Sequence, residues 1–186
     1  MEDSAIIDLY WAREEQALTE TDAKYGGMCR TIAYNILSSR EDSEECVNDT
    51  WLRAWNTMPP NRPGVLSAFL SKITRNLSLD RYKASRAAKR GGGQLPLALE
   101  ELGDCVPAPS TVEEAAELAE LTRLLDRFLR DLPEKEACVF LRRYWYVDST
   151  REIAQRYEMA EGSVKSMLYR VRQKLRRRLE QEGIAL

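Results

Sequence analysis

Residues 149–179 read STREIAQRYEMAEGSVKSMLYRVRQKLRRRL, and two local patterns divide them into a pair of helices. Ser149 and Glu152 form an S-x-x-E capping box, in which the two side chains satisfy backbone N–H groups at a helix start. A break follows at residues 158–160. The second helix then repeats apolar residues every three or four positions: Val164, Leu168, Val171, Leu175 and Leu179. The stretch therefore predicts a helix-turn-helix whose second helix packs along one apolar stripe.

The other face of this second helix is strongly basic. Residues 165–178 contain seven Lys or Arg residues and no acidic residue, although the whole chain carries a net charge of -2. A helix that merely faces solvent more often alternates Glu with Lys, because such pairs attract at i,i+4 spacing. A long basic face on the second helix of such a motif is suited to the major groove of DNA. We therefore favour DNA binding over a simply solvated surface.

Charge is segregated along the rest of the chain as well. Residues 72–90 hold seven basic residues and one acidic residue, whereas residues 41–49 and 100–120 contain no Lys or Arg. An even distribution of charge would have argued against nucleic acid, given the slightly acidic total. This segregation instead predicts two basic faces, and acidic surfaces that meet other partners.

Several classes of protein are disfavoured by composition. The chain has no histidine, which removes the commonest general base and metal ligand, and its four cysteines show no C-x-x-C spacing. We therefore expect packed, reduced thiols, no catalytic site, and neither a metal nor a cofactor. No basic-then-apolar signal segment and no run of membrane-span length is visible, so the sequence predicts a cytoplasmic protein without membrane insertion.

The pattern of apolar residues and breakers predicts an all-α fold, with two small helical domains joined by a flexible linker. The first domain, residues 1–90, should contain helices that start at Ser4, at Thr19 or Thr21, at Asp42 or Ser43, and near Ser67. Residues 91–111 are acidic and punctuated by Gly and Pro, so we expect a linker there. The second domain, residues 112–186, opens with a helix capped by Ser110 or Thr111 and ends in the helix-turn-helix.

A proline-rich loop at residues 56–65 precedes a helix with a polar, basic face. Such a face beside a rigid loop is suited to melted nucleic acid, whose bases are splayed and exposed one at a time. Taken alone this signal is weak, because basic helix faces more often only meet solvent.

Two stretches of the first domain read DSEECVNDTWLRAW, at residues 42–55, and AFLSKITRNLSLDRYK, at residues 68–83. They resemble the second conserved region of bacterial sigma factors. LPEKEACVFLRRY at residues 132–144 and STREIAQRYEMAEGSVKSMLYRVRQKL at residues 149–175 resemble their fourth region. Two such regions joined by a short linker are the layout of the extracytoplasmic-function group.

The resemblance implies three sets of contact residues. At the clamp coiled coil of core RNA polymerase it implies Asp42, Glu45, Asn48, Asp49, Leu52 and Arg53. At the melted strand of the minus-ten element it implies Asn61, Arg62, Lys72, Arg75 and Asn76. At the minus-thirty-five element it implies Ser163, Lys165, Ser166, Tyr169, Arg170 and Arg172.

The implied partners are core polymerase, through its clamp coiled coil and flap, and promoter DNA. The acidic linker would run toward the active-site cleft and RNA exit path. An anti-sigma factor is a common further partner in this group, and the sequence identifies none.

Several positions depart from the usual pattern of these regions, and two of them bear on the helix-turn-helix directly. Glu158 stands where the turn often has Gly, so we expect its backbone to differ. Met167 replaces a usual Arg in the second helix, so the promoter motif does not carry over from relatives.

A second reading stays open: a helix-turn-helix regulator that binds duplex DNA without polymerase. The acidic helix at residues 42–55 and the basic surface at residues 62–83 are redundant under that reading.

Overall fold

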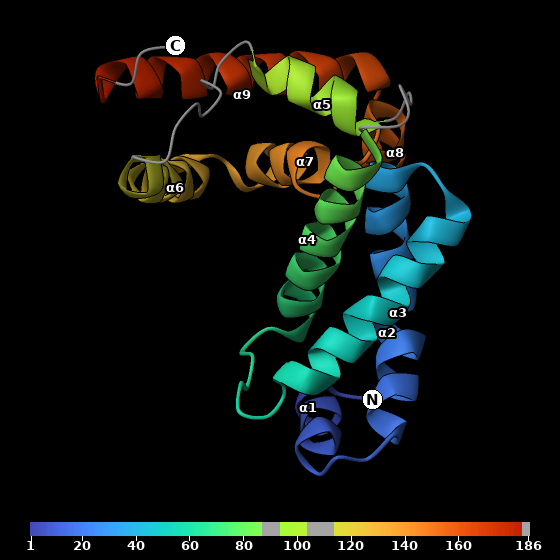
Figure 1. Cartoon of the computed structure of the whole chain (residues 1–186). Helices are drawn as coiled ribbons and strands as arrows, with labels where there is room; N and C mark the ends of the chain where they lie inside the picture. The colour runs from blue at the N-terminus through green and yellow to red at the C-terminus, as the bar shows by residue number, and fades with distance from the viewer. Residues whose placement is uncertain (87–93, 104–113, 184–186) are drawn as a thin grey trace. The chain divides into compact units, whose positions relative to one another are not determined.

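The computed structural model describes residues 1–86, 94–103 and 114–183, and every regular element within them is an α-helix. The chain divides into two compact units, Met1–Gly93 and Gln94–Leu186 (Figure 1). The predicted all-α fold is confirmed. The helix caps expected at Ser110 or Thr111 lie outside the described residues. No helix in the described ranges combines the length and the apolar character needed to cross a bilayer.

The first unit is a bundle of four helices: α1 (Asp3–Trp11), α2 (Gln16–Leu37), α3 (Arg40–Thr57) and α4 (Leu66–Arg86). The long helix α2 packs against both α3 and α4, and α1 closes one end of the bundle (Figure 1). The core consists of side chains with no exposed surface, among them Ile6, Tyr10, Cys29, Val47, Leu66 and Leu70. A loop at residues 58–65 joins α3 to α4 and lies beside α1 (Figure 1).

Three predicted helix starts in this unit are wrong by a few residues. Helix α1 begins at Asp3 after Glu2, and not at Ser4, while α2 begins at Gln16, ahead of both threonines. Thr21 is instead buried, with its Oγ1 atom 3.0 Å from the Tyr10 hydroxyl. Threonine is common at helix starts, so the local sequence suggested a cap at this position. The packing of the core instead gives the Thr21 hydroxyl a partner inside the protein.

The start of α3 is also earlier than expected. Ser39 caps this helix by accepting a 3.3 Å hydrogen bond from the Asp42 N–H group. Asp42 lies in the first helical turn, where its charge complements the helix dipole, and Ser43 is buried. Ser38 makes the preceding break by adopting left-handed backbone geometry, with φ 55°.

The second unit contains α5 (Gln94–Gly103), α6 (Glu114–Asp131), α7 (Glu134–Tyr144), α8 (Thr150–Arg156) and α9 (Glu161–Gln181). The predicted capping box at the start of α8 is confirmed, with both reciprocal hydrogen bonds between Ser149 and Glu152. The apolar stripe of α9 is confirmed too: its five residues are each at most 2 % exposed. Helix α9 packs along this stripe against α7 and α8.

Helix α5 lies within the linker that the sequence predicts at residues 91–111, where no helix was expected. Its ten residues form a helix that packs on α7, with Leu95 and Ala98 buried. Pro96 is tolerated because it lies in the first turn, where a missing N–H costs nothing. The helix was missed because its apolar residues lie on more than one side and only two of them are buried, and because the surface it packs against comes from a distant part of the sequence.

Candidate nucleic-acid interface

The first half of α9 presents the polar face that the sequence predicted. Five of the six predicted residues are exposed there: Ser163, Lys165, Ser166, Tyr169 and Arg170. Tyr169 is 57 % exposed, which is unusual for an aromatic ring in a packed helical unit. This face can offer hydroxyl and guanidinium hydrogen bonds to base edges and phosphates.

The turn before α9 fixes how this helix leaves α8. Glu158 has a φ of 51°, the left-handed conformation that glycine adopts most easily. The turn therefore keeps the geometry of a glycine turn with a glutamate in it, contrary to the expectation of a different backbone. The Thr150 hydroxyl donates a 2.8 Å hydrogen bond to Glu161, which ties the start of α8 to the start of α9.

Arg172, the sixth predicted residue, points into the protein. Its side chain is 17 % exposed, and Nη1 donates a 2.7 Å hydrogen bond to the Tyr144 hydroxyl and lies 3.6 Å from Glu101 Oε2. This corrects its assignment to the exposed face. Helical periodicity places Arg172 next to the apolar stripe. Its hydrogen-bond acceptors come from α5 and α7, so they become apparent only when these helices are packed against α9.

Glu101 of α5 is the centre of this internal network. It accepts hydrogen bonds of 2.7 and 3.2 Å from Arg143, which is 2 % exposed, and one of 2.9 Å from the Tyr144 hydroxyl. Burial by itself would raise the pKa of Glu101, but the hydrogen bond and positive charge of Arg143 outweigh it and hold that pKa below its usual value. Burial also raises the pKa of the Tyr144 hydroxyl, so it remains a donor.

The predicted minus-ten residues lie on α4 and on the loop that precedes it. Lys72 and Asn76 are exposed on α4, and Asn61 and Arg62 are exposed on the loop. Arg62 is held in place: its Nη2 atom is 2.5 Å from Asp8 Oδ1, and its guanidinium lies 5.9 Å from the centre of the Trp11 ring.

Arg75 departs from this set because it is half-buried rather than exposed. Burial lowers the pKa of its guanidinium, which reflects the cost of removing the charge from water. The prediction that it belongs to an exposed basic face is therefore corrected. Ser78, one turn further along α4, is fully buried beside Cys46.

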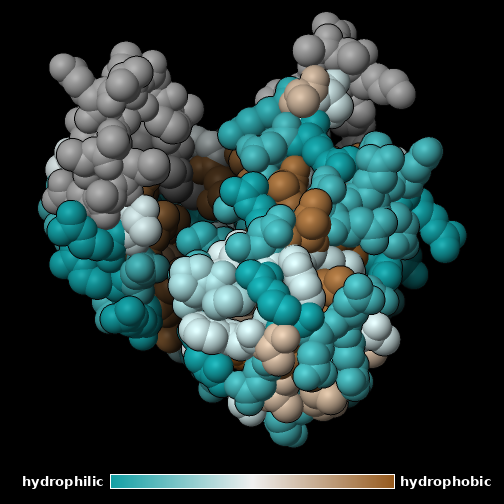
Figure 2. All heavy atoms as spheres, turned by 60° about the horizontal axis from the view of Figure 1, so that its bottom comes forward, coloured by the Kyte–Doolittle hydropathy of each residue, from teal (hydrophilic) through white to brown (hydrophobic). Residues whose placement is uncertain are grey.

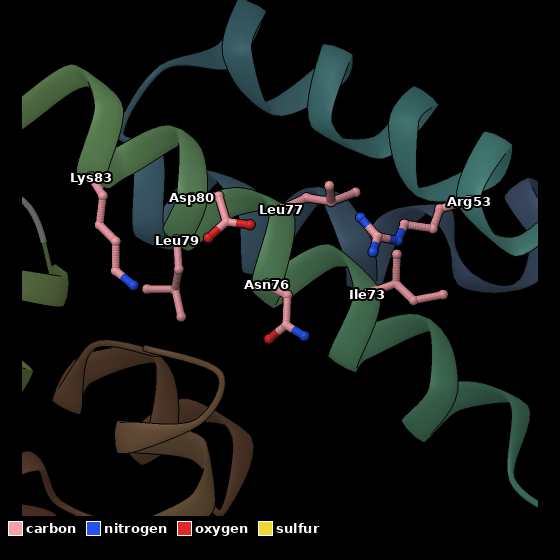
Figure 3. A pocket seen from close by; sticks show the side chains of 7 residues that line it. All are labelled: Arg53, Ile73, Asn76, Leu77, Leu79, Asp80 and Lys83. Atoms are coloured by element: carbon pink, nitrogen blue, oxygen red, sulfur yellow. The ribbon is translucent and has the colours of Figure 1, made fainter. Parts of the chain in front are cut away.

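A pocket of about 310 Å³ joins two of the predicted sets. Arg53 enters it from α3, while Asn76, Asp80 and Lys83 line it from α4 (Figure 3). Its apolar wall is formed by Ile73, Leu77 and Leu79. Arg53 was predicted to face polymerase and Asn76 to face DNA, so the structure brings together two residues that the sequence had assigned to separate surfaces.

The predicted polymerase-binding residues form one face of α3. Asp42, Glu45, Asn48, Leu52 and Arg53 are exposed, and Asp49 is partly so. Leu52 has 60 % of its surface exposed, which makes an apolar point within a polar face.

Arg81 of α4 is a residue that sequence reasoning missed. It forms ion pairs of 2.8 Å with Glu45 and 2.5 Å with Asp49, and these two carboxylates raise its pKa above the usual value. Part of the acidic charge on α3 is therefore already neutralised within the molecule. No local signal reveals this pairing, because α3 and α4 meet only through packing.

Among the residues that the structure describes, no group of three or more acidic, Cys or His side chains is placed to hold a metal ion. Cys29 and Cys46 are buried, as expected for packed thiols, and Cys138 is partly exposed.

Comparison with known proteins supports the resemblance. Residues 23–88 match the family described as Sigma-70 region 2, and residues 122–175 match Sigma-70, region 4. The chain is 30% identical over 160 residues to the ECF RNA polymerase sigma factor SigL of Mycobacterium tuberculosis, with 82% of each chain covered. The chain belongs to the extracytoplasmic-function sigma factor family.

Two further relatives are longer than this sigma factor chain. It is 31% identical over 150 residues to the ECF RNA polymerase sigma factor SigE of Mycolicibacterium smegmatis, covering 78% of this chain and 54% of that protein. It is 27% identical over 151 residues to the probable RNA polymerase sigma factor RfaY of Xanthomonas campestris, covering 81% of this chain and 37% of that protein. The chain thus spans about half or less of these two relatives.

Proposed function

We propose that this sigma factor directs bacterial core RNA polymerase to specific promoters and assists their melting. The observation that carries the proposal is that the two units expose surfaces of different charge. One unit exposes an acidic helix face and a basic loop and helix, and the other exposes a basic helix at the end of a helix-turn-helix. Two modules with different charge suit a protein that must bind a polymerase and two promoter elements together.

In this proposal α3 docks on the clamp coiled coil of core polymerase. The supporting features are the exposed Leu52 and the carboxylates of Glu45 and Asp49. Arg81 holds these carboxylates in fixed positions, which lowers the entropy lost when a partner binds them.

A charge swap separates direct contact from folding. Asp49→Arg alone would lose its ion pair with Arg81 and reverse the surface charge, whereas Asp49→Arg with Arg81→Asp restores an internal pair. We expect both variants to compete poorly for core polymerase. If the double variant binds as well as the unsubstituted chain, Asp49 acts only within the fold.

The exposed face of α9 is proposed to read the minus-thirty-five element, and Arg170 is its strongest candidate for a base or phosphate contact. Arg170→Ala should lower transcription from an intact upstream element by roughly tenfold, from about 1–3 kcal/mol per good contact. Both proteins should be equally weak on a scrambled element. The matched control is Arg127→Ala, an exposed arginine on α6.

Reconstituted transcription decides between this function and a regulator that works without polymerase. Purified protein and bacterial core polymerase are incubated with a genomic promoter library, and start sites are mapped with and without the protein. New start sites that need the protein support the proposal and give the promoter sequence. Duplex binding without polymerase, combined with no new start site, would favour the stand-alone regulator.

Cytoplasmic location, together with an anti-sigma partner, remains part of this proposal. Neither is needed for the transcription experiment.

A further inference from the structure

Trp11 is an exposed aromatic ring at a fixed place on the first unit. It is the last residue of α1, and 43 % of its surface is exposed. The neighbouring Tyr10 is fully buried, with its hydroxyl 3.0 Å from Thr21 Oγ1. Arg13 follows in left-handed geometry, with φ 59°, and donates a 2.7 Å hydrogen bond to the Trp55 carbonyl. The backbone that carries Trp11 is therefore braced on both sides.

The ring of Trp11 lies beside the proline-containing loop that carries Arg62. The Arg62 guanidinium is 5.9 Å from the ring centre, within the range of a cation–π contact. Asp8, one helical turn before Trp11, holds the same guanidinium through the 2.5 Å ion pair. Helix α1 and the loop thus place an aromatic ring and a positive charge next to each other, although they are about fifty residues apart in the sequence.

An exposed ring beside a guanidinium is the combination that proteins use for single-stranded nucleic acid. Every unpaired base can stack on an aromatic ring, while the cation attracts the backbone phosphate. Bases within a duplex cannot do this, because their faces are covered by neighbouring pairs. The surface at this end of the unit is mostly hydrophilic with small apolar patches (Figure 2), which favours a charged polymer over an apolar docking partner.

We propose that Trp11 is a stacking platform for an unpaired base of the melted promoter strand, with Arg62 on the adjoining phosphate. This rests on the proposed function, and it adds a contact on α1, outside the loop and α4 surface assigned above. On binding, Arg62 exchanges its ion pair with Asp8 for the phosphate, so the ring and the charge act on the same nucleotide.

The test measures the lifetime of the open complex after a heparin challenge, on a promoter found by the start-site mapping. Trp11→Ala and Trp11→Leu should each shorten the lifetime about tenfold, since stacking on a ring is lost in both. Trp11→Phe should stay within about threefold of the unsubstituted chain, because a π face remains. Tyr34→Ala, which removes another exposed ring of the same unit, should change nothing.

Three results would overturn the proposal. A Trp11→Leu complex as long-lived as the Trp11→Phe complex would show that Trp11 only packs. Weaker competition of Trp11→Ala for core polymerase would make Trp11 a protein contact. Unchanged lifetime in Trp11→Ala would remove it from the promoter surface. The proposed function fails by a different result, namely that the unsubstituted chain produces no start site at all.

Discussion

Arg143 of α7 and Glu101 of α5 form a two-point ion pair, with distances of 2.7 and 3.2 Å between their nitrogen and oxygen atoms. The arginine side chain is 3 % exposed and the glutamate side chain 30 %. The Asp148 carbonyl and Gln94 accept further hydrogen bonds from Arg143, at 3.0 and 2.9 Å. A charge so deeply buried requires its partner, so this pair fastens α5 to the rest of the second unit.

Glu101→Gln should destabilise the second unit by about 3 kcal/mol, the lower end of the range for a broken buried pair, because it leaves the buried Arg143 without its carboxylate while Glu101 itself is partly exposed. The measurement is urea denaturation, together with hydrogen exchange of the α5 and α7 amides. Glu100→Gln changes an exposed neighbour and should stay within about 0.5 kcal/mol. Equal exchange rates in the two variants would contradict the role of Glu101.

The same pair predicts a dependence on pH. Glu101 has a pKa below its ordinary value in the folded protein, so between these two values the unfolded chain binds more protons than the folded chain. Its stabilising contribution is therefore complete above the ordinary pKa and is lost as the pH falls toward the lowered one. The difference in unfolding free energy between the unsubstituted chain and Glu101→Gln should shrink as pH is lowered from 6 to 3. A constant difference would exclude this linkage.

Glu158→Gly should stabilise the helix-turn-helix by up to about 1 kcal/mol. The glutamate occupies left-handed backbone geometry. This conformation is unfavourable in free energy for a residue with a Cβ atom and nearly unstrained for glycine. Gln155→Gly, in the last turn of α8 where the backbone is helical, is the matched control and should destabilise by up to about 1 kcal/mol. Thermal unfolding of the two variants compares them directly, and a loss of stability in both would show that the turn has no such strain.

Thiol reactivity should separate the cysteines. Burial raises the pKa of Cys29 to about 11, and burial likewise raises that of Cys46, so few thiolates exist at either position at neutral pH. Cys138 is partly exposed. Alkylation with iodoacetamide at pH 8, followed by peptide mapping, should therefore modify Cys138 well before Cys29 or Cys46. Labelling of Cys29 at the rate of Cys138 would require an opening of the α2–α4 packing.

Helix α9 shows how much of the structure can be predicted from local sequence. Its apolar stripe and the capping box of α8 appear in the structure as predicted, and so do the exposed positions of Lys165 and Arg170. These features depend on spacing within a few residues, which helical geometry converts directly into a face or a cap. Helix α5 escaped the same reasoning, since a short helix with two buried residues is defined mainly by what it packs against.

Helical periodicity and the order of the motifs were enough to predict the all-α fold, the two modules and the family, because both are local or linear properties of the chain. Which charges face outward, in contrast, depends on how the helices pack. Arg172, which the sequence placed on the exposed face of its helix, turns toward Glu101. Arg81 pairs with Glu45 and Asp49, two carboxylates that the sequence assigned to a surface free to bind polymerase. Ion pairs form when packing brings charges from separate helices within a few ångströms, and burial changes the free energy of each charge. Neither distance nor burial can be read from spacing along one helix.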